Sequence, residues 1–396
     1  MTAHLEQWLG LALRWAHVIV GVSWIGTSFY FNWLNARFAH PATPEPGVSG
    51  ELWSVHGGGF YRVVKYGVAP GRLPATLHWF KWEAYATWWT GMSLLVLLYY
   101  VGARAYLLDP MVSSIAPATG IAIGSASLAV SWLVYDGMCR SPLEAQPAVL
   151  AGLGLILVTV LAWGLSHLLS ARAAYLHVGA ALGTIMAANV FRVIIPSQRA
   201  MVASLTAGQA PDAWRGRQAA LRSLHNNYLT LPVLFVMVSS HYPETYGSPW
   251  GWAILGALFV IGVLVRHWFN LRNAGRPNRW LLPAAALGLV ALAALTAPRG
   301  DGAGPATGSP APFAEVRVVI AQRCAPCHSS APTYPGISVA PAGVMFDTPA
   351  EIQGKAQRIL DRAVTTKTMP LGNLTGISDA ERDLLGRWVA DGASLR

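Results

Sequence analysis

Charged side chains are scarce in this chain of 396 residues, because Asp, Glu, Lys and Arg make up only 12% of it. Soluble domains carry about 25%. Cysteine is scarce as well, with three residues, which excludes a disulfide scaffold. The sequence has no adjacent His-His pair of the haem–copper type and no nucleotide or flavin fingerprint. Hydrophobic residues make up 54%, so a disordered chain and most soluble enzymes are excluded.

Long apolar stretches dominate the first three quarters of the chain, and a helix needs about 20 residues to cross a bilayer. Because backbone polar groups in lipid must be satisfied internally, we predict an all-α bundle of eight transmembrane helices. The predicted spans are Trp8–Leu34, Ala84–Val101, Gly120–Tyr135, Ala148–Leu168, Ala174–Ile195, Tyr228–His241, Trp252–Phe269 and Leu281–Ala297.

Basic residues concentrate in alternate connections, after the first, third, fifth and seventh predicted spans. Positive charge stays on the cytoplasmic side of a membrane. We therefore expect a bacterial inner-membrane protein with both termini in the periplasm. This topology explains much of the net charge of +10 and leaves no reason to predict a nucleic-acid partner.

The composition changes near residue 298. Residues 298–312 are rich in Pro, Gly and Ala, which is typical of a flexible linker. We therefore predict a transmembrane domain over 1–297, a linker over 298–312 and a small soluble domain over 313–396. In the last domain, Thr348 and Ser378 each begin a helix-capping box, and 313–323 is amphipathic.

The strongest motif lies in the small domain. Cys324, Cys327 and His328 form a C-x-x-C-H sequence, which attaches haem c covalently. His328 is then one axial ligand of the iron, and a distant methionine commonly supplies the other. Met369 is the better candidate and Met345 the alternative. A redox dithiol or half a zinc site is less suitable, because no second cysteine pair exists. We therefore predict a class I cytochrome c domain, which places it outside the cytoplasm.

Histidines inside a membrane are functional candidates, because an ionisable group is costly there. His17 and His177 align in two similar segments, and His78 and His225 begin another similar pair, which indicates a weak four-plus-four internal repeat. These four are candidate ligands of a second, b-type haem or members of a proton relay. The alternative is a histidine bonded to a neighbouring helix. The catalytic residue stays unassigned.

The connection after the first predicted span combines glycine, basic and aromatic residues. Exposed glycine N–H groups and cations favour an anion, and aromatic rings stack on flat molecules. An interfacial helix resting on lipid headgroups is the alternative. The candidate anion-binding residues are His56, Gly57, Gly58, Arg62, Lys65, Lys81 and Glu83.

Several segments together resemble the membrane-bound urate hydroxylase family, also described as cytochrome-c-linked urate oxidase. They begin at His17, Val55, Leu77 and Ser223 and read HVIVGVSWIGTSFYF, VHGGGFY, LHWFKWEAY and SLHNNYLTLPVLF. The first also resembles the membrane protoporphyrinogen oxidases, whose corresponding histidine is linked to haem. The resemblance implies oxidation of urate to 5-hydroxyisourate during purine degradation. Electrons then leave through the cytochrome domain to a further cytochrome c or a terminal oxidase, not to dioxygen.

Two other functions are compatible with the same residues. One is a membrane electron conduit for a separate dehydrogenase. The other is a porphyrin- or quinol-oxidising membrane enzyme, which needs a large apolar pocket and no basic loop. Urate is a flat monoanion at neutral pH, so cations with aromatic rings are the required groups, and a histidine is the natural base.

Overall fold

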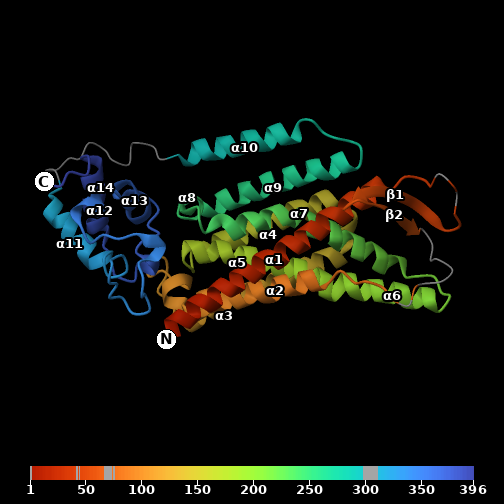
Figure 1. The fold of residues 1–396 in the computed structure, drawn as a ribbon, viewed down its shortest axis with the longest axis horizontal. Helices are drawn as coiled ribbons and strands as arrows, with labels where there is room; N and C mark the ends of the chain where they lie inside the picture. The colour runs from red at the N-terminus through yellow and green to blue at the C-terminus, as the bar shows by residue number, and fades with distance from the viewer. Residues whose placement is uncertain (1, 42, 44, 67–73, 75, 298–310) are drawn as a thin grey trace.

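The computed structural model describes residues 2–41, 43, 45–66, 74, 76–297 and 311–396. About 69% of the described residues are helical, in agreement with the predicted helical fold. The predicted linker, apart from Ala311 and Pro312, lies outside the described residues. The helices before it form an elongated bundle, and those after it form a separate unit at one end of the bundle (Figure 1).

The bundle contains α-helices joined by short π- and 3₁₀-helical pieces. Their bounds are α1 Thr2–Arg37, α2 Trp82–Leu95, η1 Val96–Val101, η2 Ala103–Leu107, α3 Pro117–Arg140, η3 Pro142–Ala145, α4 Pro147–Ser166, α5 Ala171–Ala188, η4 Asn189–Ile194, α6 Ile195–Thr206, α7 Ala213–Ser239, α8 Pro243–Tyr246, α9 Gly251–Asn273 and α10 Leu281–Thr296.

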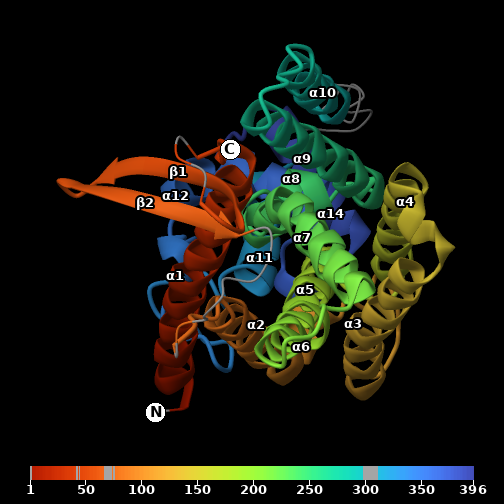
Figure 2. The same cartoon turned by 90° about the vertical axis from the view of Figure 1, so that its right-hand side faces the viewer.

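Helix α5 lies at the centre of the bundle, among α2, α3, α4 and α7 (Figure 2). Small residues allow these close approaches. A Cβ atom on Gly179 would lie 2.4 Å from Val236 Cγ1 on α7, so only glycine fits there. By contrast, α1 lies on the outside, with many exposed apolar side chains.

Five helical segments, not the eight predicted, are long and apolar enough to cross a membrane among the described residues. They are His4–Arg37, Pro117–Arg140, Pro147–Ser166, Ala171–Thr206 and Gly251–Asn273. The other three predicted spans fail for different reasons. Helix α2 has 14 residues before the π-helical η1 begins, α7 carries many polar residues in its first half, and α10 has 16 residues.

A β-hairpin interrupts the otherwise helical bundle, so the all-α prediction is wrong at this point. Strands β1 (Val48–His56) and β2 (Gly59–Tyr66) pair antiparallel, with His56 opposite Gly59. Gly57 and Gly58 form the turn with φ of +56° and +80°. A two-residue turn with both φ positive matches the twist of the strands and favours glycine. The segment is therefore neither an interfacial helix nor an open glycine loop.

The C-terminal unit has its own hydrophobic core, built around Phe313, Ile320, Leu385 and Trp388. Its elements are α11 Phe313–Arg323, η6 Pro341–Gly343, α12 Pro349–Gln353, α13 Ala356–Ile359, η7 Leu360–Thr365, η8 Leu371–Asn373 and α14 Asp379–Ala390. Both predicted capping boxes are present. Thr348 begins α12 and Ser378 begins α14, each with its side chain accepting from the backbone three residues later.

The C-terminal unit contacts the bundle through η2 and α8, at what we call the docked end. A Cβ atom on Gly372 would lie 2.8 Å from the carbonyl oxygen of Ala105, so the two backbones touch. A Cβ atom on Gly247 would similarly meet the Thr366 side chain at 2.7 Å. The opposite end of the bundle carries β1, β2 and α6, and we call it the hairpin end (Figure 1).

Candidate functional site

The C-x-x-C-H sequence forms a single tight turn at the end of α11. Cys324 ends the helix, and its carbonyl oxygen accepts the N–H groups of Cys327 at 3.2 Å and His328 at 3.0 Å. Both thiols are free. Among the residues that the structure describes, no group of three or more His, Cys, Asp or Glu side chains is placed to hold a bare metal ion. The turn therefore presents two thiols and one imidazole from the same few residues.

His328 is oriented by a backbone hydrogen bond. Its Nδ1 lies 3.0 Å from the Val344 carbonyl oxygen, so this nitrogen carries the proton and Nε2 is left as the free lone pair. Burial lowers the pKa of His328, which favours the neutral form that binds metals. Burial also raises the pKa of the Cys324 thiol to about 12. A neutral imidazole held through its other nitrogen is the usual arrangement of a metal-binding histidine, so these residues fit a covalently attached haem.

Met369 lies in the loop between η7 and η8. Its N–H donates to the Arg362 carbonyl oxygen at 2.9 Å, and its own carbonyl oxygen accepts from Arg382 Nη1 at 2.8 Å. The alternative ligand, Met345, follows Val344, whose carbonyl lies on the Nδ1 side of His328. Met369 and Met345 both stay predictions for the second axial position, with Met369 preferred for its place in the sequence, 41 residues after His328.

His177 is fully buried in α5 near the docked end. Its Nδ1 donates to the Ala173 carbonyl oxygen at 2.9 Å, and its Nε2 lies 3.3 Å from the Tyr100 hydroxyl. Across the interface with α3, a Cβ atom on Gly124 would lie 2.5 Å from that Nε2. The residues around this imidazole therefore leave no space for a side chain at position 124.

His17 has different neighbours. Its Nδ1 lies 2.9 Å from Thr90 Oγ1 on α2. The partners of His17 and His177, Thr90 and Tyr100, are ten residues apart on the continuous α2–η1 segment, which corresponds to about 15 Å along a helix axis. The structure does not bring these two histidines together, so they do not fit a single shared haem. Either one as a lone haem ligand stays a prediction.

The second pair of aligned histidines is also separated. His78 lies in the connection before α2, is exposed, and packs edge-on against Phe80. His225 lies inside α7, where its Nδ1 is 2.8 Å from the Tyr135 hydroxyl. His78 therefore lies outside the candidate spanning helices, and the two environments give no support to the repeat.

Basic residues of the hairpin are engaged with neighbours on the same chain. Arg62 donates to Glu51 at 2.7 Å and to Glu45, and these hydrogen bonds raise the pKa of its guanidinium. Lys65 donates to Asn35, and Lys81 lies over the Trp82 ring. His56, Gly57 and Gly58 are exposed at the tip, and Glu83 lies in the first turn of α2. The structure does not gather the predicted anion-binding residues around one cavity.

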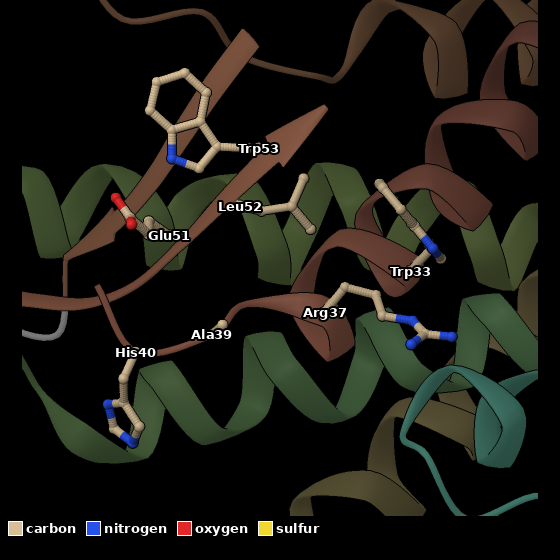
Figure 3. A pocket seen from close by; sticks show the side chains of 7 residues that line it. All are labelled: Trp33, Arg37, Ala39, His40, Glu51, Leu52 and Trp53. Carbon is tan, nitrogen blue, oxygen red and sulfur yellow. The ribbon is translucent and has the colours of Figure 1, made fainter. Parts of the chain in front are cut away.

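A shallow cavity of about 470 Å³ does lie at the base of the hairpin (Figure 3). None of the predicted anion-binding residues lines it. Trp53 and His40 point in opposite directions in Figure 3, so the side chains fan out. The lining residues are Trp33, Arg37, Ala39, His40, Glu51, Leu52 and Trp53.

A buried polar network at the hairpin end was not predicted from the sequence. It joins α3, η4 and α7. Asn189 donates to Asn226 at 2.8 Å and to the Tyr135 hydroxyl at 3.1 Å. The same hydroxyl contacts His225 Nδ1, and Cys139 Sγ lies 3.8 Å from that nitrogen. One chain of contacts therefore links a buried amide, a phenol and an imidazole.

Arg222 connects this network to the surface. It is fully buried, and its Nη1 donates to Asn189 Oδ1 at 3.3 Å. Its Nη2 donates to Asp136 Oδ1 at 2.8 Å, and Asp136 also accepts from Arg140 at 2.7 Å. The Nε of Arg222 has no hydrogen-bond partner among the described residues. Two arginines thus share a single carboxylate.

A cavity of about 560 Å³ opens beside Asp136. It lies between α3 on one side and η4 and α6 on the other. Polar residues three and four apart on α3 and α7 are the signal that could have found this region, because such residues share a helix face. The lining residues are Trp132, Leu133, Asp136, Arg140, Phe191, Arg192, Pro196 and Arg199.

Comparison with known proteins bears on the bundle alone. No curated protein and no solved structure matches this chain. A family model described as urate oxidase N-terminal matches residues 3–297, which covers the hairpin, the buried network and every candidate spanning helix. The chain belongs to the urate oxidase N-terminal family, whose description indicates a role related to urate oxidation.

Proposed function

We propose that this protein is a membrane-bound oxidoreductase that converts urate to 5-hydroxyisourate and passes the electrons to a haem c on its C-terminal unit. The observation that carries the proposal is the combination of two parts in one chain. The family match covers the bundle, and the C-x-x-C-H turn lies in a unit that contacts the bundle through η2. One chain would therefore carry both the bundle that oxidises the substrate and the unit through which the electrons leave.

The reaction fixes what the protein has to supply. The urate monoanion plus one water gives neutral 5-hydroxyisourate, one proton and two electrons. The bundle must bind a flat anion, admit water and accept the proton. Cys324, Cys327 and His328 would hold a haem, and that group would supply one-electron redox chemistry, so the two electrons would leave in successive transfers. A further cytochrome c or a terminal oxidase is the expected acceptor.

The orientation follows from charge and from haem chemistry. The hairpin end carries most basic connections, and positive charge stays on the cytoplasmic side. Haem attachment to C-x-x-C-H occurs outside the bacterial cytoplasm, which is where this orientation puts the docked end. We therefore place the protein in the inner membrane, with the hairpin end in the cytoplasm and the C-terminal unit in the periplasm.

The test uses the purified full chain without oxygen. Urate is added, the visible spectrum is recorded, and pyridine haemochrome analysis identifies the haem. We expect urate alone to reduce a c-type haem, and a Cys324→Ala/Cys327→Ala variant to lose both covalent haem and turnover. A haem c that dithionite reduces but urate does not would contradict the proposal and favour an electron conduit for a separate dehydrogenase.

A further inference from the structure

We infer that the cavity between α3 and η4–α6 is a binding site for a planar organic anion. It is built from Trp132, Phe191, Arg192 and Arg199 and backed by Arg222. Naming urate as that anion rests on the proposed function. The assignment to planar organic anions rests on the volume of the cavity, on its aromatic and basic lining, and on the buried arginine behind it.

The size and lining of the cavity suit a small flat molecule. Its volume of about 560 Å³ lies within the range of about 300–1,000 Å³ that is usual for ligand sites. Trp132 lines the cavity from α3 and Phe191 lines it from η4, where the Phe191 ring also packs edge-on against Tyr85. Aromatic side chains bind flat rings by offset or edge contacts, and a purine offers such a ring.

The cavity also offers two arginines, Arg192 and Arg199, that have no acidic partner among the described residues. Arg192, Pro196 and Arg199 are spaced by four and three residues, which puts them on one face of the η4–α6 segment. Within the described parts of the chain, neither arginine takes part in an ion pair or donates a hydrogen bond, unlike Arg62 on the hairpin. Their guanidinium groups are therefore available for an incoming anion, with planar donors that pair well with flat acceptors.

Positive charge also exceeds negative charge in the wall of the cavity, which consists of Asp136, Arg140 and the buried Arg222. Asp136 is the acidic residue of the lining, and it accepts from both Arg140 and Arg222. Glu144, the next acidic residue along the sequence, does not line the cavity and accepts a hydrogen bond from Gln218. Asp136 is therefore shared by Arg140 and Arg222, while Arg192 and Arg199 line the same cavity without an acidic partner of their own among the described residues. Burying a guanidinium with one unpartnered nitrogen costs about 1–3 kcal/mol, and Arg222 keeps such an Nε behind this wall.

The wall links the cavity to a titratable group inside the bundle. Trp132 and Asp136 line the cavity and also contact Arg222, whose guanidinium lies 5.9 Å from the Trp132 ring. From Arg222 the contacts continue through Asn189 and the Tyr135 hydroxyl to His225. An anion held in the cavity therefore lies against one end of this chain of hydrogen bonds. Tyr135 and His225 act through it as positioning residues.

The experiment measures binding rather than turnover. Full-length protein, reduced with dithionite so that urate is not consumed, is dialysed against radiolabelled urate. We expect Arg192→Gln/Arg199→Gln to weaken urate binding at least tenfold. The matched control, Arg272→Gln/Arg276→Gln, removes one arginine from the last turn of α9 and one from the connection that follows it. Neither lines the cavity, so this variant should bind like the wild type. Circular dichroism checks that both variants keep their helices.

Anionic lipid headgroups share the chemistry of the anion, so the measurement is repeated in nanodiscs. One set contains phosphatidylglycerol and the other only phosphatidylcholine. Urate binding that depends on Arg192 and Arg199 in phosphatidylcholine supports the inference. Unchanged urate affinity in the double variant, with loss of bound phosphatidylglycerol, would make the cavity a headgroup site and overturn it.

The outcome is separable from the proposed function. If urate reduces the haem of the double variant and binds to it as it does in the wild type, the cavity inference fails and the proposed function stands. If the wild type neither binds urate nor is reduced by it, the proposed function fails. In that case, equal phosphatidylglycerol binding by the wild type and by the Arg192→Gln/Arg199→Gln variant would show that the cavity does not bind anions.

Discussion

The hairpin and the α3–η4 cavity are two basic regions at the same end of the bundle, and they differ in what their arginines contact. On the hairpin, Arg62 is held by Glu45 and Glu51. In the cavity, Arg192 and Arg199 form no ion pair within the described part of the chain. The difference teaches that the count of basic residues in a connection does not identify an anion site. Availability is decided by acids that approach from elsewhere in the chain.

The largest effect is expected on replacing the buried arginine of the cavity wall. Arg222→Met removes the partner of Asp136 and Asn189 and should lower the free energy of unfolding by about 3 kcal/mol, the cost of breaking a buried pair. Arg62→Met is the matched hairpin variant, and its exposed pairs should contribute no measurable stability. Thermal unfolding in detergent gives both values. Equal losses for the two variants would remove the distinction between the regions.

A smaller effect is expected for the phenol of the network. Tyr135→Phe leaves His225 and Asn189 each without one hydrogen bond, which should cost about 1–3 kcal/mol and lower kcat for urate more than it changes KM. Tyr61→Phe on the exposed hairpin surface is the control. A Tyr135→Phe protein with wild-type kcat and stability would show that the network has no part in the reaction.

The smallest effect is expected at the hairpin turn. Gly58 has φ of +80°, and Gly58→Ala forces an alanine into left-handed space at a cost of about 1–2 kcal/mol. Because we assign the glycine to the turn and not to an anion, urate binding and turnover should stay unchanged. Gly26→Ala in α1, where no atom lies within 4 Å of the new Cβ, is the matched control. A specific loss of urate affinity in Gly58→Ala would return the substrate site to the hairpin.

Local sequence signals predicted local structure well. The capping boxes at Thr348 and Ser378 were found because each uses residues three positions apart. The C-x-x-C-H turn was found for the same reason, since its backbone bonds all lie within Cys324–His328. The longest apolar runs also correspond to candidate spanning helices. In each case the interacting residues are neighbours in the sequence.

The sequence failed where the deciding partner is distant. The hairpin was missed because His56, Gly57, Gly58 and Gly59 fit both a tight turn and an anion-binding loop. The pairing of β1 with β2 shows the turn. The buried network was missed because Tyr135 and His225 are 90 residues apart. The predicted spans at α2 and α7 failed because a hydropathy pattern does not show where a helix turns π-helical or buries its polar face inside a bundle.

Arg382 connects the Met369 loop of the C-terminal unit with the surface where that unit contacts the bundle. Its side chain is buried and bonded to the Met369 and Ala363 carbonyl oxygens, and its Nη2 lies 3.9 Å from Met111 Sδ at the docked end. A shift of the docking contact would therefore reach the Met369 loop through Arg382, and would change the haem environment if Met369 is a ligand as predicted. Linkage is reciprocal, so if docking shifts the reduction potential of that haem, the oxidation state of the haem would bias docking by the same free energy. Spectroelectrochemistry of Gly372→Val, which wedges a side chain into the contact, would expose this coupling. An unshifted potential would show that the C-terminal unit acts as an electron carrier insensitive to how it is seated on the bundle.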